Sequence, residues 1–103
     1  MSRFNIVLSG EDRTDTEAYI GYDRPLRSFF LQAFWIDSED FDIPEIWLGT
    51  SLGEFPTLES LVEEAKGQGY KIRSLDNSAI VTMLSEAGHK PEPSLGERLG
   101  IVF

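Results

Sequence analysis

Hydrophobic and polar residues alternate in two stretches near the start of the chain, over residues 4–9 and 17–22. A period of two is typical of a β-strand with one buried face, so each stretch predicts a strand. The residues between them are turn formers and charged side chains, which favours a hairpin. Pro25 should end the second strand, because its ring fixes φ and restricts the residue before it.

The most apolar part of the chain is the run of residues 28–36, in which only Ser28 and Gln32 are polar. In a strand, strict alternation places one set of side chains on each face. One face would carry Phe29, Leu31, Ala33 and Trp35, and the other Ser28, Phe30, Gln32, Phe34 and Ile36. Both faces are apolar, so this strand is either covered on both sides or leaves one face as a binding surface.

After this run, charge and a proline predict a loop over residues 37–45, followed by a fourth strand over residues 46–50. The four strands would form an antiparallel meander, because each follows the previous one through a short connection.

The rest of the chain predicts two helices separated by a short strand. Thr57 can cap a helix whose apolar residues recur at i, i+3, i+4 and i+7, with Gly67 near its end. Residues 70–75 predict a fifth strand, and residues 76–87 predict a second helix that ends at Gly88.

We expect one domain over residues 1–103, because a chain of this length is too short for two stable cores without disulfides or metal ions. Residues 90–93 form a proline-rich spacer, and residues 94–103 form a short C-terminal tail. Two helices are too few to cover both faces of the sheet. The expected fold class is therefore α+β: an antiparallel sheet of four to five strands with two helices packed on one face.

The balance of charges narrows the choice of partners. Acidic residues outnumber basic ones by 18 to 9, which gives a formal net charge of −9. This charge repels phosphate backbones and anionic lipids, so we expect neither direct nucleic-acid binding nor membrane binding. Near the amino terminus the apolar run over residues 6–8 is far too short for a signal-sequence core. The absence of cysteine fits a reducing compartment, and we expect a cytoplasmic protein.

The loop over residues 37–45 is strongly acidic and contains no basic side chain. An EF-hand loop starting at Asp37 would need an oxygen ligand where the chain has Phe41, so we predict no metal site. The loop is either a solvated segment or a docking site for a basic partner. In the second case the contact residues would be Asp37, Glu39, Asp40 and Asp42.

No motif indicates catalysis. His89 is the only histidine and lies at a predicted helix end, and the glycines match neither a Walker loop nor a dinucleotide turn. No serine lies in a G-x-S-x-G elbow. We therefore predict no catalytic residue and no cofactor.

One face of the predicted sheet can collect aromatic side chains from several strands. The candidates are Tyr19, Phe30, Phe34 and Trp47. Exposed together, they would form a patch that requires a protein partner or a second copy of the chain, as a homodimer. The leading hypothesis is a small, acidic, non-enzymatic binding or regulatory protein that uses this aromatic face. One alternative is an acidic nucleic-acid mimic that inhibits a DNA- or RNA-handling enzyme, and another is an enzyme with an unrecognised acid–base pair of carboxylates.

Three segments carry a resemblance: YIGYDRPLRSFFLQ at residues 19–32, IWLGT at residues 46–50 and TLESL at residues 57–61. Together they resemble a group of short uncharacterised proteobacterial proteins associated with plasmids and integrating elements. The resemblance covers roughly the middle half of the chain. It implies an accessory bacterial protein and transfers no activity or catalytic residue.

Overall fold

The computed structural model describes residues 2–36 and 43–88. Its elements are β1 (Ser2–Ser9), β2 (Thr14–Asp23), β3 (Ser28–Ile36), β4 (Ile43–Leu48), α1 (Leu58–Gly67), β5 (Lys71–Arg73) and α2 (Asn77–Glu86). The acidic candidates at 37–42, the spacer and the tail lie outside the described residues.

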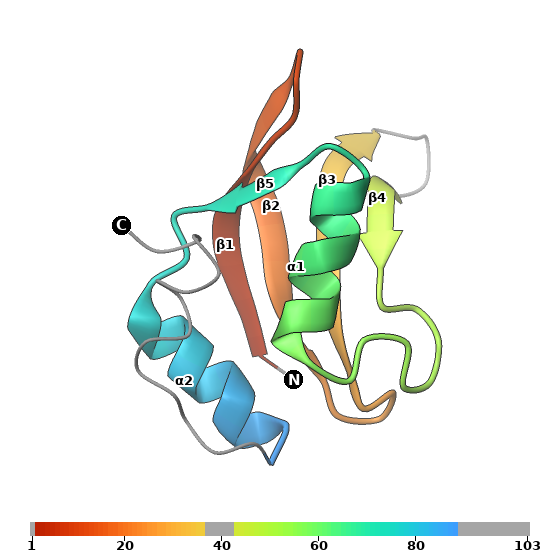
Figure 1. Cartoon of the computed structure of the whole chain (residues 1–103), viewed down its shortest axis with the longest axis vertical. Coiled ribbons are helices and arrows are strands. Elements are labelled where there is room, and N and C mark those ends of the chain that lie inside the picture. Colours follow the sequence, from red (N-terminus) through yellow and green to blue (C-terminus); the bar gives the residue numbers. More distant parts are fainter. Residues whose placement is uncertain (1, 37–42, 89–103) are drawn as a thin grey trace.

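The five strands form one antiparallel sheet in the order β4-β3-β2-β1-β5 (Figure 1). The predicted meander of the first four strands and the α+β class are confirmed. β4 begins at Ile43, three residues earlier than the sequence predicts, so Pro44 lies in a strand and not in a loop. A proline is tolerated there because β4 is an edge strand and needs hydrogen bonds on one side only.

One face of the sheet forms the hydrophobic core. Rows of cross-strand partners such as Phe4, Ile20 and Leu31 lie on this face. Ile20 and Leu31 belong to a single buried cluster, and Phe4 packs against it. Helix α1 lies over β3 in Figure 1 and contributes four of its residues to that cluster. Helix α2 also contributes four buried residues. The packing of both helices on the same face stays a prediction.

The helices begin where the sequence places their caps. The hydroxyl of Thr57 accepts a hydrogen bond from the Ser60 backbone N–H at 3.1 Å, and the Ser60 hydroxyl accepts one from the Thr57 N–H. At the start of α2, the carboxylate of Asp76 accepts from the Ala79 N–H at 2.8 Å. Neither helix of the described residues has the length and apolar character that crossing a bilayer requires.

The segment between β4 and α1 passes close to the start of β3. Ser28 is fully buried, and its hydroxyl accepts a hydrogen bond from the Phe55 N–H at 2.9 Å. Gly49 has a φ of +86°, and a Cβ there would lie 2.2 Å from the Phe29 carbonyl oxygen. Only glycine fits this position, and the close approach places Gly49 beside Phe30.

At Phe34 the side chains of strand β3 stop alternating regularly between the two faces of the sheet. This residue has a φ of 56°, whereas regular strands have negative φ. Its N–H donates to the Asp15 carboxylate at 2.6 Å, next to a register shift between β1 and β2. As a result Phe34 packs against the core cluster and Trp35 contacts Tyr19, the reverse of what alternation predicts.

Candidate functional site

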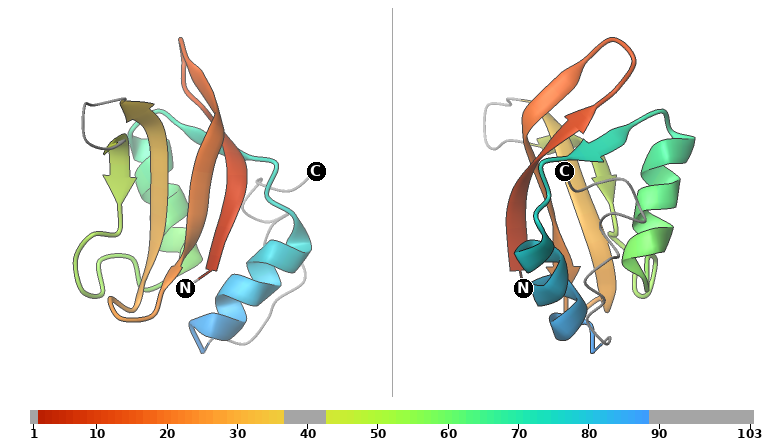
Figure 2. Two further views of the ribbon diagram at one scale, coloured as in Figure 1. Left: turned by 180° about the vertical axis from the view of Figure 1, so that it is seen from behind. Right: turned by 60° about the vertical axis from the view of Figure 1, so that its left-hand side comes forward.

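The sheet face opposite the core carries two adjacent cross-strand rows. In the first row Arg3 lies opposite Gly21, which lies opposite Phe30. In the second row Asn5, Tyr19, Gln32 and Trp47 are successive partners. We call the surface formed by Arg3, Tyr19, Phe30, Gln32, Trp35 and Trp47 the open face. The left view of Figure 2 looks onto the strands from this side, with α1 behind them.

Arg3 is held over the aromatic side chains of the open face. Its guanidinium carbon lies 3.9 Å from the centre of the Tyr19 ring and 5.9 Å from the Trp35 ring. The two rings meet edge to face at 6.3 Å, and the Trp35 indole N–H donates to the Glu17 carbonyl oxygen. Within residues 2–36 and 43–88 the one ion pair joins Arg13 and Glu45, so Arg3 has no carboxylate partner there.

A concavity of about 300 Å³ opens on this face beside Phe30. Gly21, which has no side chain, separates Arg3 from Phe30 in the first row, and the lining residue Gly49 lies close to the backbone of β3. The lining of the concavity also includes Arg3, Asp23, Leu26, Phe30, Gln32 and Trp47. Phe30 is 5% exposed but does not belong to the core cluster, whereas Trp47 is 51% exposed. The concavity therefore has an apolar floor and a half-exposed indole in its wall.

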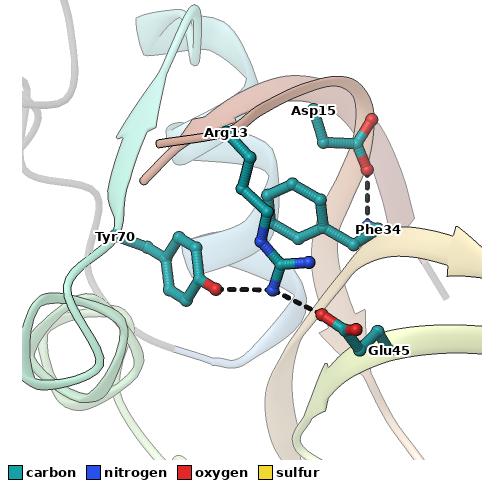
Figure 3. Close-up of polar contacts among 5 residues, drawn as sticks. All are labelled: Arg13, Asp15, Phe34, Glu45 and Tyr70. Atoms are coloured by element: carbon teal, nitrogen blue, oxygen red, sulfur yellow. Dashed lines mark hydrogen bonds and ion pairs between the residues drawn. The ribbon is translucent and has the colours of Figure 1, made fainter. Parts of the chain in front are cut away.

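A second cluster lies near the hairpin between β1 and β2 (Figure 3). The guanidinium of Arg13 stacks on the Phe34 ring at 3.9 Å, donates to the Tyr70 hydroxyl at 2.7 Å and pairs with Glu45. The hydrogen bonds of its guanidinium to Glu45 and to Tyr70 raise the pKa of Arg13 above its ordinary value. The cluster ties the hairpin to β4 and to the segment before β5, which is a structural role.

The structure brings together three of the four predicted aromatic residues. Tyr19, Phe30 and Trp47 lie on the open face. Phe34 does not, because the change of facing in β3 directs it to the core and to Tyr70 at 5.6 Å. Asp37, Glu39, Asp40 and Asp42 lie outside the described residues. The role of all these residues in partner binding stays a prediction.

Neither Arg3 nor Trp35 is among the residues that the sequence predicts for this face. Arg3 precedes the alternating pattern of the first strand, so a place on the polar side could have been inferred from Phe4 and Ile6. Its position opposite Gly21 depends on the pairing of β1 with β2, which no local signal gives. Alternation predicts Trp35 on the face of Phe29, Leu31 and Ala33, and this is wrong because alternation fails at Phe34.

Two carboxylates of the acidic stretches already have partners inside the chain. Asp15 accepts hydrogen bonds from two backbone N–H groups, those of Glu17 and Phe34, and Glu45 pairs with Arg13. In the part of the chain that the structure describes, no three histidine, aspartate or glutamate side chains gather as a metal site would require.

Comparison with models of protein families, with curated proteins and with solved structures finds no match to this chain. The resemblance to short proteobacterial proteins therefore stays a prediction. The chemistry of the open face, which offers aromatic surface, one guanidinium and a concavity, suits binding.

Proposed function

We propose that this chain is a small, non-enzymatic binding or regulatory protein that engages a protein partner, or a second copy of itself, through the open face. The observation that carries the proposal is the half-exposed indole of Trp47 beside the concavity over Phe30. Tryptophan anchors in partly desolvated pockets dominate the binding energy of many protein interfaces.

Trp47 lies outside the core cluster, so it adds little to the packing that holds the fold together. Its neighbours are also unusual for a plain solvent-facing sheet, because Tyr19 and Trp35 are half-buried against each other and against Arg3. An aromatic and arginine composition is typical of the central part of interfaces. We place this activity in the cytoplasm of a bacterium, on the basis of the cysteine-free sequence and the resemblance.

The nucleic-acid mimic has less support. A mimic needs a row of free carboxylates, and Asp15 and Glu45 are engaged within the chain. An acid–base pair of carboxylates gains no support from the open face either, since Asp23 is the only acidic residue among the described ones that line the concavity over Phe30.

The test compares Trp47→Ser with Leu52→Ser. Leu52 is 74% exposed and does not line the concavity, so it controls for the loss of an exposed apolar side chain. The solution mass and the proteins retained by affinity purification are measured for both variants and the wild type. We expect Trp47→Ser to lose a retained partner or a dimer that Leu52→Ser keeps, while both variants unfold at the wild-type temperature. Equal retention by all three proteins would contradict the proposal.

A further inference from the structure

The concavity over Phe30 combines an apolar floor with positive charge at its edge. Phe30 forms the floor, Leu26 and Trp47 stand beside it, and Arg3 lines the same space. Its volume of about 300 Å³ lies at the lower end of the usual range for ligand sites, about 300–1,000 Å³. A space of this size suits one large apolar side chain.

Basic residues occur at and near the concavity although the whole chain is acidic. The chain carries a net charge of −9, yet the turn that supplies Asp23 and Leu26 to the lining also contains the exposed Arg24 and Arg27. Arg3 lines the concavity, whereas Arg24 and Arg27 belong to the turn without lining it. In the described part of the chain none of the three has an ion-pair partner.

Within residues 2–36 and 43–88, the lining contains one carboxylate, that of Asp23. It accepts a hydrogen bond from the Leu26 N–H at 3.3 Å and thereby closes the turn. Among the described residues, the lining therefore holds one guanidinium without an ion-pair partner, that of Arg3, and one carboxylate that is already engaged within the turn. A carboxylate of a partner would meet attraction here that most of the acidic surface cannot offer.

We propose that the concavity binds a protein segment in which an aromatic or long aliphatic side chain stands beside a carboxylate. The apolar side chain fills the space over Phe30, and the carboxylate pairs with the guanidinium of Arg3. The guanidinium carbon of Arg3 lies 3.9 Å from the centre of the Tyr19 ring, and this stacking orients the side chain before a partner binds. Less side-chain entropy is therefore lost when the planar guanidinium pairs with a carboxylate. This inference rests on the proposed function and specifies the chemistry of the partner.

Other occupants fit the charges less well. A basic segment would place its charge against the guanidinium of Arg3. A nucleic acid would be repelled by the net charge of the whole chain. A second copy would have to pair its own Asp23 or Glu17 with Arg3, which the experiment below distinguishes.

Two small probes isolate the carboxylate. N-acetylphenylalanine has a free carboxylate beside an aromatic ring, and N-acetylphenylalaninamide has the same ring without the charge. Each is titrated at millimolar concentration into the full-length wild type, Arg3→Gln and Arg73→Gln, with backbone amide NMR shifts as the readout. Arg73 lies in β5 and does not line the concavity, so its variant controls for the loss of one positive charge.

We expect the wild type to bind N-acetylphenylalanine about tenfold more tightly than N-acetylphenylalaninamide. A preference of this size is what one charge-assisted hydrogen-bonded pair contributes to affinity. Arg3→Gln should lose this preference and Arg73→Gln should keep it, with the largest shifts at Phe30 and Trp47. Equal affinity for the two probes, or no binding of either, overturns this inference and leaves the test with Trp47→Ser decisive for the proposed function. A dimer in sedimentation that Trp47→Ser dissociates identifies a second copy as the occupant, which overturns the inference and supports the proposed function.

Discussion

Backbone conformation at single residues decides which side chains reach the open face. The positive φ of Phe34 sends its ring toward Tyr70 and brings Trp35 to Tyr19. A residue with a side chain in this region of φ costs about 1–2 kcal/mol. Packing of the Phe34 ring, stacking of Arg13 and the hydrogen bond to Asp15 offset that cost.

Gly49 and Gly53 provide a matched test of this principle. Both have a positive φ, but a Cβ at position 49 would lie 2.2 Å from the Phe29 oxygen, whereas a Cβ at position 53 would meet nothing within 4 Å. We expect Gly53→Ala to lower the free energy of unfolding by about 1 kcal/mol, from backbone strain alone. Gly49→Ala should lower it by about 3 kcal/mol or more, because backbone atoms must also move.

Urea unfolding followed by circular dichroism measures both losses. Equal losses for the two variants would show that the segment after β4 can move away from β3 at little cost.

At the scale of elements, a few polar contacts fix where each helix begins. Helix α1 begins at a reciprocal pair of hydroxyl contacts between Thr57 and Ser60, whereas α2 begins at the charged carboxylate of Asp76. The two caps therefore differ in their dependence on pH, since hydroxyl groups do not titrate in the acid range.

Asp76→Asn tests the charged cap. Hydrogen bonds from the Ala79 N–H and the Ser78 hydroxyl lower the pKa of Asp76 from its ordinary value of 3.8. A carboxyl with a lowered pKa in the folded state stabilises the fold above its unfolded pKa, and this contribution is lost as the pH falls through the folded value. We expect the stability advantage of the wild type over Asp76→Asn to be complete at neutral pH and to shrink at pH values below 3.8.

Thr57→Ala serves as the control for this pH series. It should destabilise the protein by about 1 kcal/mol at every pH, because it removes an uncharged cap. The free energy of unfolding is measured by urea denaturation between acid and neutral pH. A wild-type advantage over Asp76→Asn that stays constant across the series would disagree with the lowered pKa.

On the scale of the whole molecule, one cluster of buried side chains joins both helices to the sheet. Leu61 of α1 is fully buried in it, together with Leu31 and Ala33 of β3 and Ile46 of β4. The two tryptophans lie on β3 and β4, outside this cluster. Helices and open face should therefore lose their structure in a single cooperative transition.

Leu61→Ala tests this cooperativity. Truncation of a buried leucine typically costs about 2–5 kcal/mol. We expect the helical circular dichroism and the tryptophan fluorescence to shift together to lower urea concentration. The exposed Glu63→Ala, on the same helix, should shift neither signal. A fluorescence transition that stayed in place while the dichroism shifted would show that the open face folds independently of the helices.

The sequence by itself determined the elements and the fold class. Alternation around Ile6 and Ile20, the helical period from Leu58 and the cap at Thr57 are local properties, because each depends on residues a few positions apart. Alternation also made Tyr19, Phe30 and Trp47 candidates for one face, but the strand that carries Phe30 is apolar on both sides, so its pattern alone did not show which face is open.

Only the tertiary structure decided the composition of the open face. Alternation holds as long as the backbone stays extended, and it fails at the positive φ of Phe34, so Trp35 takes the expected place of Phe34. The position of Arg3 across from Gly21, and hence the concavity over Phe30, follows from strand register. Register is set by pairing between distant parts of the chain, which no local pattern encodes.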